Sequence, residues 1–188
     1  MSDAERDQAV RLALVEEAAR RSSVLWLDYA GLDRPRPAWH VWKDGAAYVV
    51  ADAGEGRGEG TAGPEQSLPG LAGASSATVN CRSKDSGARL VSWRAAVERL
   101  APGTPDWEEA LGALRADRLN TVDGPGLAAR WAESAVIVRL TPTGEVLEAP
   151  GSMPADRAAA PPPASPATTT GRLPWVVHKR PRHRPRLS

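Results

Sequence analysis

The sequence has a single cysteine and no long apolar run, and each shortage excludes a class of protein. Because Cys81 has no second cysteine to pair with, a domain held together by its own disulfides is excluded. No stretch approaches the roughly 18 to 20 apolar residues that a membrane-spanning helix needs, and residues 1–10 lack the apolar segment of an export signal. We therefore expect a cytoplasmic protein that does not insert into a membrane.

Basic residues are concentrated near the C-terminus. Six of the 24 Lys and Arg residues, and none of the 23 Asp and Glu residues, fall within residues 171–188, so the rest of the chain carries a charge of about −5. Residues 149–170 contain six prolines and seven alanines, a composition that favours a disordered linker. We expect affinity for nucleic acid or another anionic partner to belong to the basic tail, residues 171–188.

The tail also contains an apolar segment, Trp175-Val176-Val177. Two interpretations remain open for it. Like charges and prolines favour a solvated, disordered tail, whereas the apolar segment favours docking as an added strand on the chain itself or on a partner.

Ahead of the linker, the pattern predicts one domain that opens with a helix and is otherwise rich in strands. Val10, Leu14 and Ala18 recur every four residues within residues 3–20, which indicates an amphipathic helix. Short apolar runs follow from Ser23, and Asp44-Gly45 between two of them is typical of a tight hairpin.

The second half of the domain mixes strand and helix signals. Residues 77–83 indicate a strand, and a second hairpin through residues 84–87 leads into residues 89–100, whose pattern suits a strand or a helix; we favour the strand. Thr104-Pro105-Asp106 is a good helix start, with an end expected near Asn120. A turn around Trp131 and a strand over residues 134–140, closed by a turn at residues 141–144, complete the prediction.

Most residues that could carry chemistry favour structural roles instead. His40 has no second histidine or cysteine at ligand spacing, so no metal site is predicted. Cys81 lies in an expected strand and is predicted to be a buried, inert thiol. The glycine-rich residues 54–63 do not match the dinucleotide fingerprint and indicate a loop. No catalytic acid, base or nucleophile can be assigned.

Aromatic residues alternate along the second apolar run of the domain. In a strand, Trp39 and Val41 share one face, and Ala38, His40 and Trp42 share the other. One face would then belong to the core, while the other lines a groove for a flat ring or a dimer surface. A purely structural aromatic pair is the favoured interpretation.

Three stretches together resemble a known family: VLWLDYAGLDRPRPAWHVWKDGAAYVVADA, ATVNCRSKDSGARLVSWRAAVERL and PGTPDWEEALGAL. Their order of strands, hairpins and helix is similar to the FMN-binding split barrel of the pyridoxamine 5'-phosphate oxidase-like superfamily, in an actinobacterial-type branch. The resemblance implies a mainly β (α+β) fold, a split β-barrel over residues 22–148 with one or two flanking helices. An N-terminal helix, residues 1–21, would precede it, and the linker and tail would follow.

Members of this family are usually homodimers that bind FMN, or in some branches a deazaflavin or haem. The resemblance implies that Arg82, Ser83, Lys84 and Arg89 hold the phosphate and that Trp42 or Trp39 borders the ring. It therefore predicts a flavin-binding protein, either a small oxidoreductase of unknown substrate or a protein that carries the cofactor.

One departure from the family pattern favours a second hypothesis. Many cofactor-binding relatives have a basic residue in the connector after the third strand, whereas this chain has Glu65 there. Residues 82–84 also suit an ordinary charged hairpin. The alternative is a cofactor-free dimeric interaction module that uses the basic tail as its contact arm.

Overall fold

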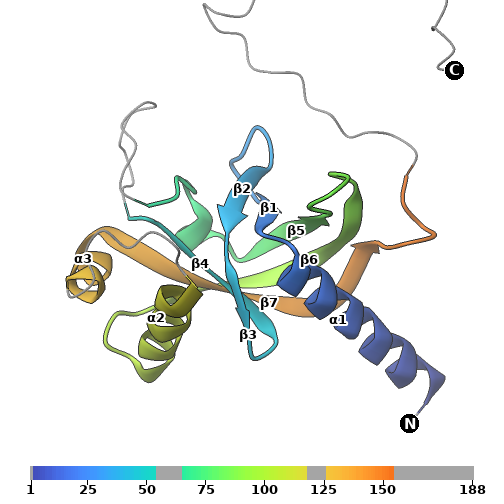
Figure 1. Ribbon diagram of the computed structural model, residues 1–188, viewed down its shortest axis with the longest axis horizontal. Helices are drawn as coiled ribbons and strands as arrows, with labels where there is room; N and C mark the ends of the chain where they lie inside the picture. The colour runs from blue at the N-terminus through green and yellow to red at the C-terminus, as the bar shows by residue number, and fades with distance from the viewer. Residues whose placement is uncertain (1, 54–64, 118–125, 155–188) are drawn as a thin grey trace, which may run out of the picture. The chain divides into compact units, whose positions relative to one another are not determined.

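The computed structural model describes residues 2–53, 65–117 and 126–154 (Figure 1). The predicted glycine-rich loop, the end of the second helix, the tail and most of the linker lie outside these residues. The helices are α1 (Asp3–Arg21), α2 (Pro105–Asp117) and α3 (Leu127–Ser134), with a 3-10 turn η1 (Leu71–Gly73). The strands are β1 (Val24–Asp28), β2 (Arg36–Trp39), β3 (Val41–Lys43), β4 (Ala46–Asp52), β5 (Ser76–Arg82), β6 (Arg89–Leu100) and β7 (Ala135–Glu148).

The strands form one antiparallel, curled sheet in the order β2-β1-β5-β6-β7-β4-β3. The two edge strands, β2 and β3, are consecutive in the chain and are separated only by His40. β2 pairs with β1, and β3 pairs with β4 on the far side of the sheet. A single kinked segment therefore joins both edges, and the predicted mainly β fold with flanking helices is confirmed.

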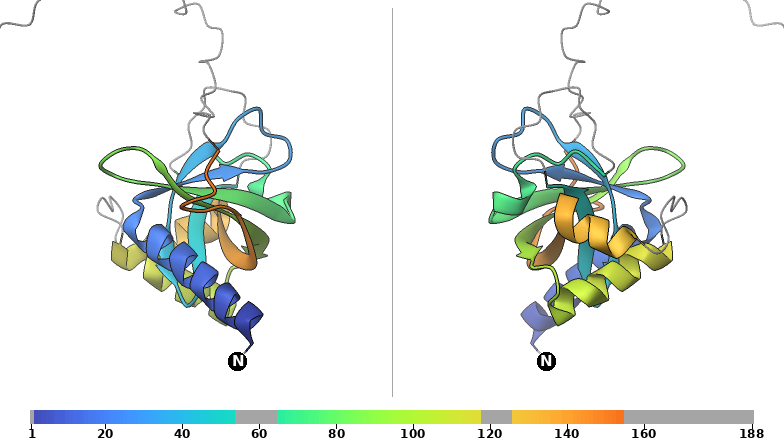
Figure 2. Two further views of the ribbon diagram at one scale, coloured as in Figure 1. Left: turned by 90° about the vertical axis from the view of Figure 1, so that its right-hand side faces the viewer. Right: turned by 90° about the vertical axis from the view of Figure 1, so that its left-hand side faces the viewer.

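Two apolar clusters lie on opposite faces of the curled sheet. The first, inside the curl, includes Leu25, Val79 and Trp93 and is covered by the C-terminal half of α1. The second lies between the outer face of β4 and β7 and helices α2 and α3, whose Trp107 and Trp131 are buried. Figure 2 shows α1 in front in one view and the α2–α3 pair in front in the opposite one. Strand β4 is buried on both faces because it contributes to both clusters.

Helix α1 begins with a capping box, in which the hydroxyl of Ser2 accepts from the Glu5 amide and the Glu5 carboxylate accepts from the Ser2 amide. Its buried residues are Val15, Ala18 and Ala19. The expectation that Val10 faces the core is wrong, since its side chain is 63% exposed. Only the later turns of the helix lie over the sheet. The helical spacing of apolar residues alone therefore overestimates the length of helix that contacts the sheet.

Most of the local predictions are confirmed. Asp44 and Gly45 have φ angles of 47° and 79°, the positive values that a two-residue hairpin demands. Residues 89–100 form a strand, as favoured, because β6 pairs on both sides with β5 and β7. Helix α2 starts where the sequence indicated, with the Thr104 hydroxyl accepting from the Trp107 amide at 3.3 Å.

The turn expected at residues 141–144 is wrong, because β7 continues as one strand to Glu148. The register shifts here instead: Trp93 pairs with Val146, whereas Ala95 pairs with Pro142. Gly144, with φ of 89°, fits the extra residues into a bulge rather than a chain reversal. The last strand ends at Glu148, and no helix among the described residues is long and apolar enough to cross a membrane.

Candidate functional site

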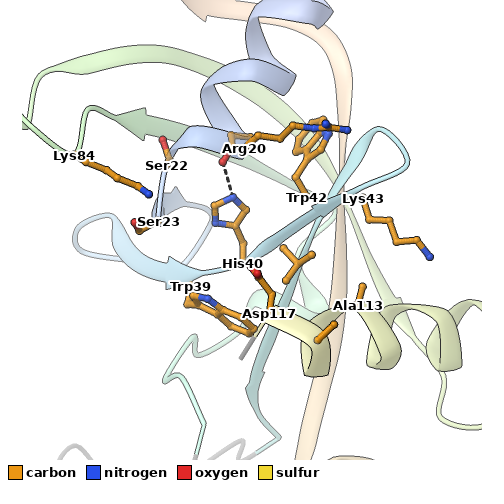
Figure 3. Close-up of a pocket in the computed structure, with 13 residues that line it drawn as sticks. Arg20, Ser22, Ser23, Trp39, His40, Trp42, Lys43, Lys84, Ala113 and Asp117 are labelled. Atoms are coloured by element: carbon orange, nitrogen blue, oxygen red, sulfur yellow. Dashed lines mark hydrogen bonds between the residues drawn. The ribbon is translucent and has the colours of Figure 1, made fainter. Parts of the chain in front are cut away.

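A cavity of about 700 Å³ opens where the kink between β2 and β3 meets the C-terminal ends of α1 and α2 (Figure 3). Its aromatic walls come from the kinked segment, which contributes Trp39, His40 and Trp42. The end of α1 contributes Ala19 and Arg20, and α2 contributes Ala113, Ala116 and Asp117. Lys84 reaches the cavity from the β5–β6 hairpin. Four segments that are far apart in sequence thus form one site.

The alternation predicted for the aromatic residues is confirmed, with one change. Ala38 and Trp42 pack on the first apolar cluster, whereas Trp39 and Val41 pack on the second. The change is that the segment is not one strand: His40 separates β2 from β3, so each face is formed by residues of two strands. The kink keeps the tryptophans half-buried, with part of each ring left to line the cavity.

The side chain of Gln66 holds the kink against β4. Its Oε1 accepts from the Trp39 amide, and its Nε2 donates to the carbonyls of Trp39 at 3.0 Å and Val50 at 2.9 Å. The backbone carbonyl of Gln66 accepts from the Asp52 amide at 3.0 Å. One carboxamide therefore replaces the missing backbone ladder between β2 and β4.

His40 is held neutral within the cavity wall. It is 6% exposed, and its Nε2 lies 3.0 Å from the carbonyl oxygen of Ala19 at the end of α1. Because a carbonyl can only accept, Nε2 carries the hydrogen and Nδ1 is the unprotonated nitrogen. Burial lowers the pKa of the imidazole, an effect that the Ala19 carbonyl and the charge of Asp117 oppose. Nδ1 has no hydrogen-bond partner among the described residues.

Trp42 joins the cavity to the core. Its ring meets that of Trp93 edge to face, with the centroids 6.2 Å apart, a favoured geometry for aromatic pairs. Its indole Nε1 is buried without a partner in the described part of the chain. The cavity wall thus holds two polar ring nitrogens, one acceptor and one donor, that no described residue satisfies.

The charged residues around the cavity differ in how they are paired. Arg20 contacts Glu16 at 2.8 Å, and Lys43 pairs with Glu109 and lies 3.7 Å from Asp44. Lys84 and Asp117 line the cavity too, and within the described ranges neither has an ion-pair partner. A ligand in the cavity would therefore meet one unpaired positive and one unpaired negative charge.

The structure brings only part of the predicted site together. Lys84 and Trp42 line the cavity, whereas Arg82 stacks on the ring of Trp26, 5.1 Å from its centroid. Ser83 uses its hydroxyl to accept from the backbone amides of residues 85 and 86. Arg89 pairs with Glu148 at 3.0 Å. Three of the four expected phosphate ligands thus have other contacts, away from the cavity lining.

Other lining residues were not singled out from the sequence. Ser22 and Ser23 follow α1, and Asp117 closes the described part of α2. In the sequence, these residues are marked only by lying next to predicted helix ends. Many capping residues have hydroxyl or carboxylate groups at the same position, so this signal does not identify a site. Only the packing of both helix ends against the kink distinguishes them.

Glu65 has a contact that explains its place in the connector. Its side chain is 2% exposed, it accepts from the Trp131 indole Nε1 at 2.7 Å, and it lies 3.5 Å from Arg130. The carboxylate therefore holds α3 to the chain that leaves β4. Glu65 therefore makes a structural contact at the position where the family pattern has a basic residue, and it does not line the cavity.

The arrangement of the sheet decides the fold. Seven antiparallel strands form a curled sheet whose two edges are joined through one kinked segment and which is flanked by helices. The chain folds as a split β-barrel flanked by helices. The split barrel matches no protein-family model, and a search of curated proteins finds no match either.

Solved structures similar to this split barrel share little sequence with it. The heme storage protein HutZ from Vibrio cholerae is 11% identical, with 71% of this chain and 90% of HutZ covered and a TM-score of 0.45. A NimC/NimA family protein from Clostridium acetobutylicum is 15% identical, with 72% and 85% covered and a TM-score of 0.40. A protein assigned as a pyridoxamine 5'-phosphate oxidase from Listeria innocua is 15% identical, with 74% and 94% covered and a TM-score of 0.42.

Proposed function

We propose that the split barrel binds a flavin, FMN or a deazaflavin, in the cavity beside His40. The observation that carries this proposal is the combination of a cavity of about 700 Å³ with two tryptophan rings and an unpaired lysine in its lining. Ligand cavities typically measure roughly 300 to 1,000 Å³ and combine aromatic walls with a few polar groups. Such a site suits a flat ring that carries an anionic group.

The groups that would hold the anion lie together. Lys84 supplies a charge, and the hydroxyls of Ser22 and Ser23 lie on the same side of the cavity (Figure 3). Ser22 donates its hydroxyl hydrogen to the carbonyl of Arg82 at 3.2 Å, which leaves its oxygen able to accept only. Lys84 and Ser23 are therefore the donors toward a phosphate.

The chemistry of the bound flavin would be hydride or electron transfer. The contribution of the chain is to border the ring with Trp39 and Trp42 and to keep His40 uncharged beside it. An uncharged imidazole next to the ring does not compete with Lys84 for the anionic group. The substrate and the direction of the reaction are not assigned.

A second candidate function is a cofactor-free, dimeric interaction module with the basic tail as its arm. The observation that favours it is the engagement of Arg82 and Arg89 elsewhere. With one cation in place of the expected three, phosphate binding is weaker, since each charge-assisted hydrogen bond contributes about 1.5 to 3 kcal/mol.

The two functions are separated by titrating the purified full chain with FMN and, separately, with an oxidised deazaflavin cofactor, following the fluorescence of the cofactor. Flavin binding predicts saturable quenching that Lys84→Gln weakens about ten-fold, the effect of losing one charged contact. Arg82→Gln is the matched control, because Arg82 lies outside the cavity lining. Absence of binding together with a dimer by light scattering would support the interaction module.

A further inference from the structure

Lys84 and Asp117, charges of opposite sign without an ion-pair partner among the described residues, line the same cavity. Figure 3 shows Lys84 with Ser22 and Ser23 on one side of His40 and Asp117 on the other. Both charged side chains are exposed, so a ligand reaches them without rearrangement of the core. The site is thus polarised from one end to the other.

Asp117 has no structural partner among the described residues. It is the last described residue of α2, and its exposed side chain belongs to the cavity lining. Neither an ion pair nor a hydrogen bond to another described residue engages its carboxylate. Its nearby charge acts on His40, where it raises the pKa of the imidazole against the larger effect of burial. A carboxylate that lines a cavity and has no partner among the described residues is available to a ligand.

The neighbouring groups decide what Asp117 can bind. Arg20 and Lys43 already have carboxylate partners, so they do not compete for Asp117. His40 is neutral, with its hydrogen directed to the Ala19 carbonyl, so it does not pair with Asp117 either. Asp117 is left as an acceptor for an N–H or O–H group that a ligand brings.

We propose that the cavity selects a dipolar aromatic ligand, with its anionic group at Lys84 and a hydrogen-bond donor at the opposite end bound by Asp117. This proposal rests on the proposed flavin binding and extends it. For FMN, the donor is the imide N3–H of the ring, so the ring enters with its pyrimidine edge toward α2. Asp117 is then a specificity-determining residue, which distinguishes ligands by their donor.

The test compares FMN with N3-methyl-FMN, which keeps the phosphate and lacks the donor, by fluorescence titration of the full chain. FMN is expected to bind Asp117→Asn about ten-fold more weakly than the wild type, the effect of one charged hydrogen bond. N3-methyl-FMN is expected to bind both proteins with that same weakened affinity. Glu108→Gln, an exposed neutralisation on the same helix outside the cavity lining, is the control and should leave both affinities unchanged.

The outcomes separate the two proposals. Unchanged FMN affinity in Asp117→Asn, or equal affinity of the wild type for FMN and N3-methyl-FMN, would overturn the role of Asp117 and leave flavin binding intact. Failure of the wild type to bind FMN at all would overturn both. Asp117 is exposed, so Asp117→Asn is not expected to unfold the protein. A thermal melt of each variant checks this.

Discussion

Replacing Gln66 by leucine should destabilise the domain by about 2 to 4 kcal/mol. The substitution keeps much of the side-chain volume and removes all three hydrogen bonds of the carboxamide. The amide of Trp39 and the carbonyls of Trp39 and Val50 then lose their side-chain partner. Each unpaired, part-buried group costs about 1 kcal/mol or somewhat more. Against the 5 to 15 kcal/mol typical of a whole domain, this is a large loss.

The assay is urea unfolding followed by tryptophan fluorescence. The midpoint should fall while the slope stays constant, because the folded state buries the same surface. Gln66→Glu is the sharper variant: it keeps the acceptor for the Trp39 amide and places a carboxylate against the two carbonyls. It should be at least as destabilised as Gln66→Leu at pH 7. Ser67→Ala, a change at the exposed neighbouring residue, is the control and should stay within about 0.5 kcal/mol of the wild type.

A loss below about 0.5 kcal/mol in Gln66→Leu would refute this reasoning, because it would mean that the kink is held by packing alone. The same variant should weaken ligand binding, since Trp39 both receives the Gln66 contacts and lines the cavity. Stability and binding therefore have one common cause at this position.

Three further predictions follow from the buried and capping groups. Burial lowers the pKa of His40, so its contribution to stability is complete above its unfolded pKa of about 6.5 and is lost as pH falls through the lower folded value; unfolding free energies of the wild type and His40→Gln at pH 5 to 8 should show a flatter profile in the variant. Burial raises the pKa of the Cys81 thiol to about 11, so at pH 8 a thiol reagent should label the native chain far more slowly than the urea-unfolded chain, and equal rates would contradict this. Thr104→Ala removes the cap of α2 and should cost about 1 kcal/mol in urea unfolding, whereas Thr104→Ser should cost little.

Features set by a few adjacent residues could be predicted from the sequence. The hairpin at Asp44-Gly45 and the start of α2 at Thr104 depend on local backbone geometry and local hydrogen bonds. The two faces of the Trp39–Trp42 segment follow from the alternation of a strand. The expected turn at residues 141–144 failed because turn-forming residues also suit a bulge, and the pairing with β6 decides between them.

The candidate site was less accessible to sequence reasoning. Lys84 and Trp42 were named, but the pattern of charges in residues 82–84 could not reveal that Arg82 stacks on Trp26. The contacts of Gln66 and the exposure of Asp117 to the cavity depend on segments separated by tens of residues. Such groups become visible only when the sheet has curled and both helix ends have met the kink.

The place of β7 in the sheet constrains how the chain can be made. It is the last strand in the sequence, yet it lies between β6 and β4 near the middle of the sheet. While the polypeptide is emerging from the ribosome, every earlier strand can be present and the sheet still remains in two pieces, with the edges of β6 and β4 unpaired. Unpaired strand edges favour association with other chains. A nascent chain stopped before residue 135 should therefore aggregate, and completion of the fold must await the synthesis of the strand that ends at Glu148.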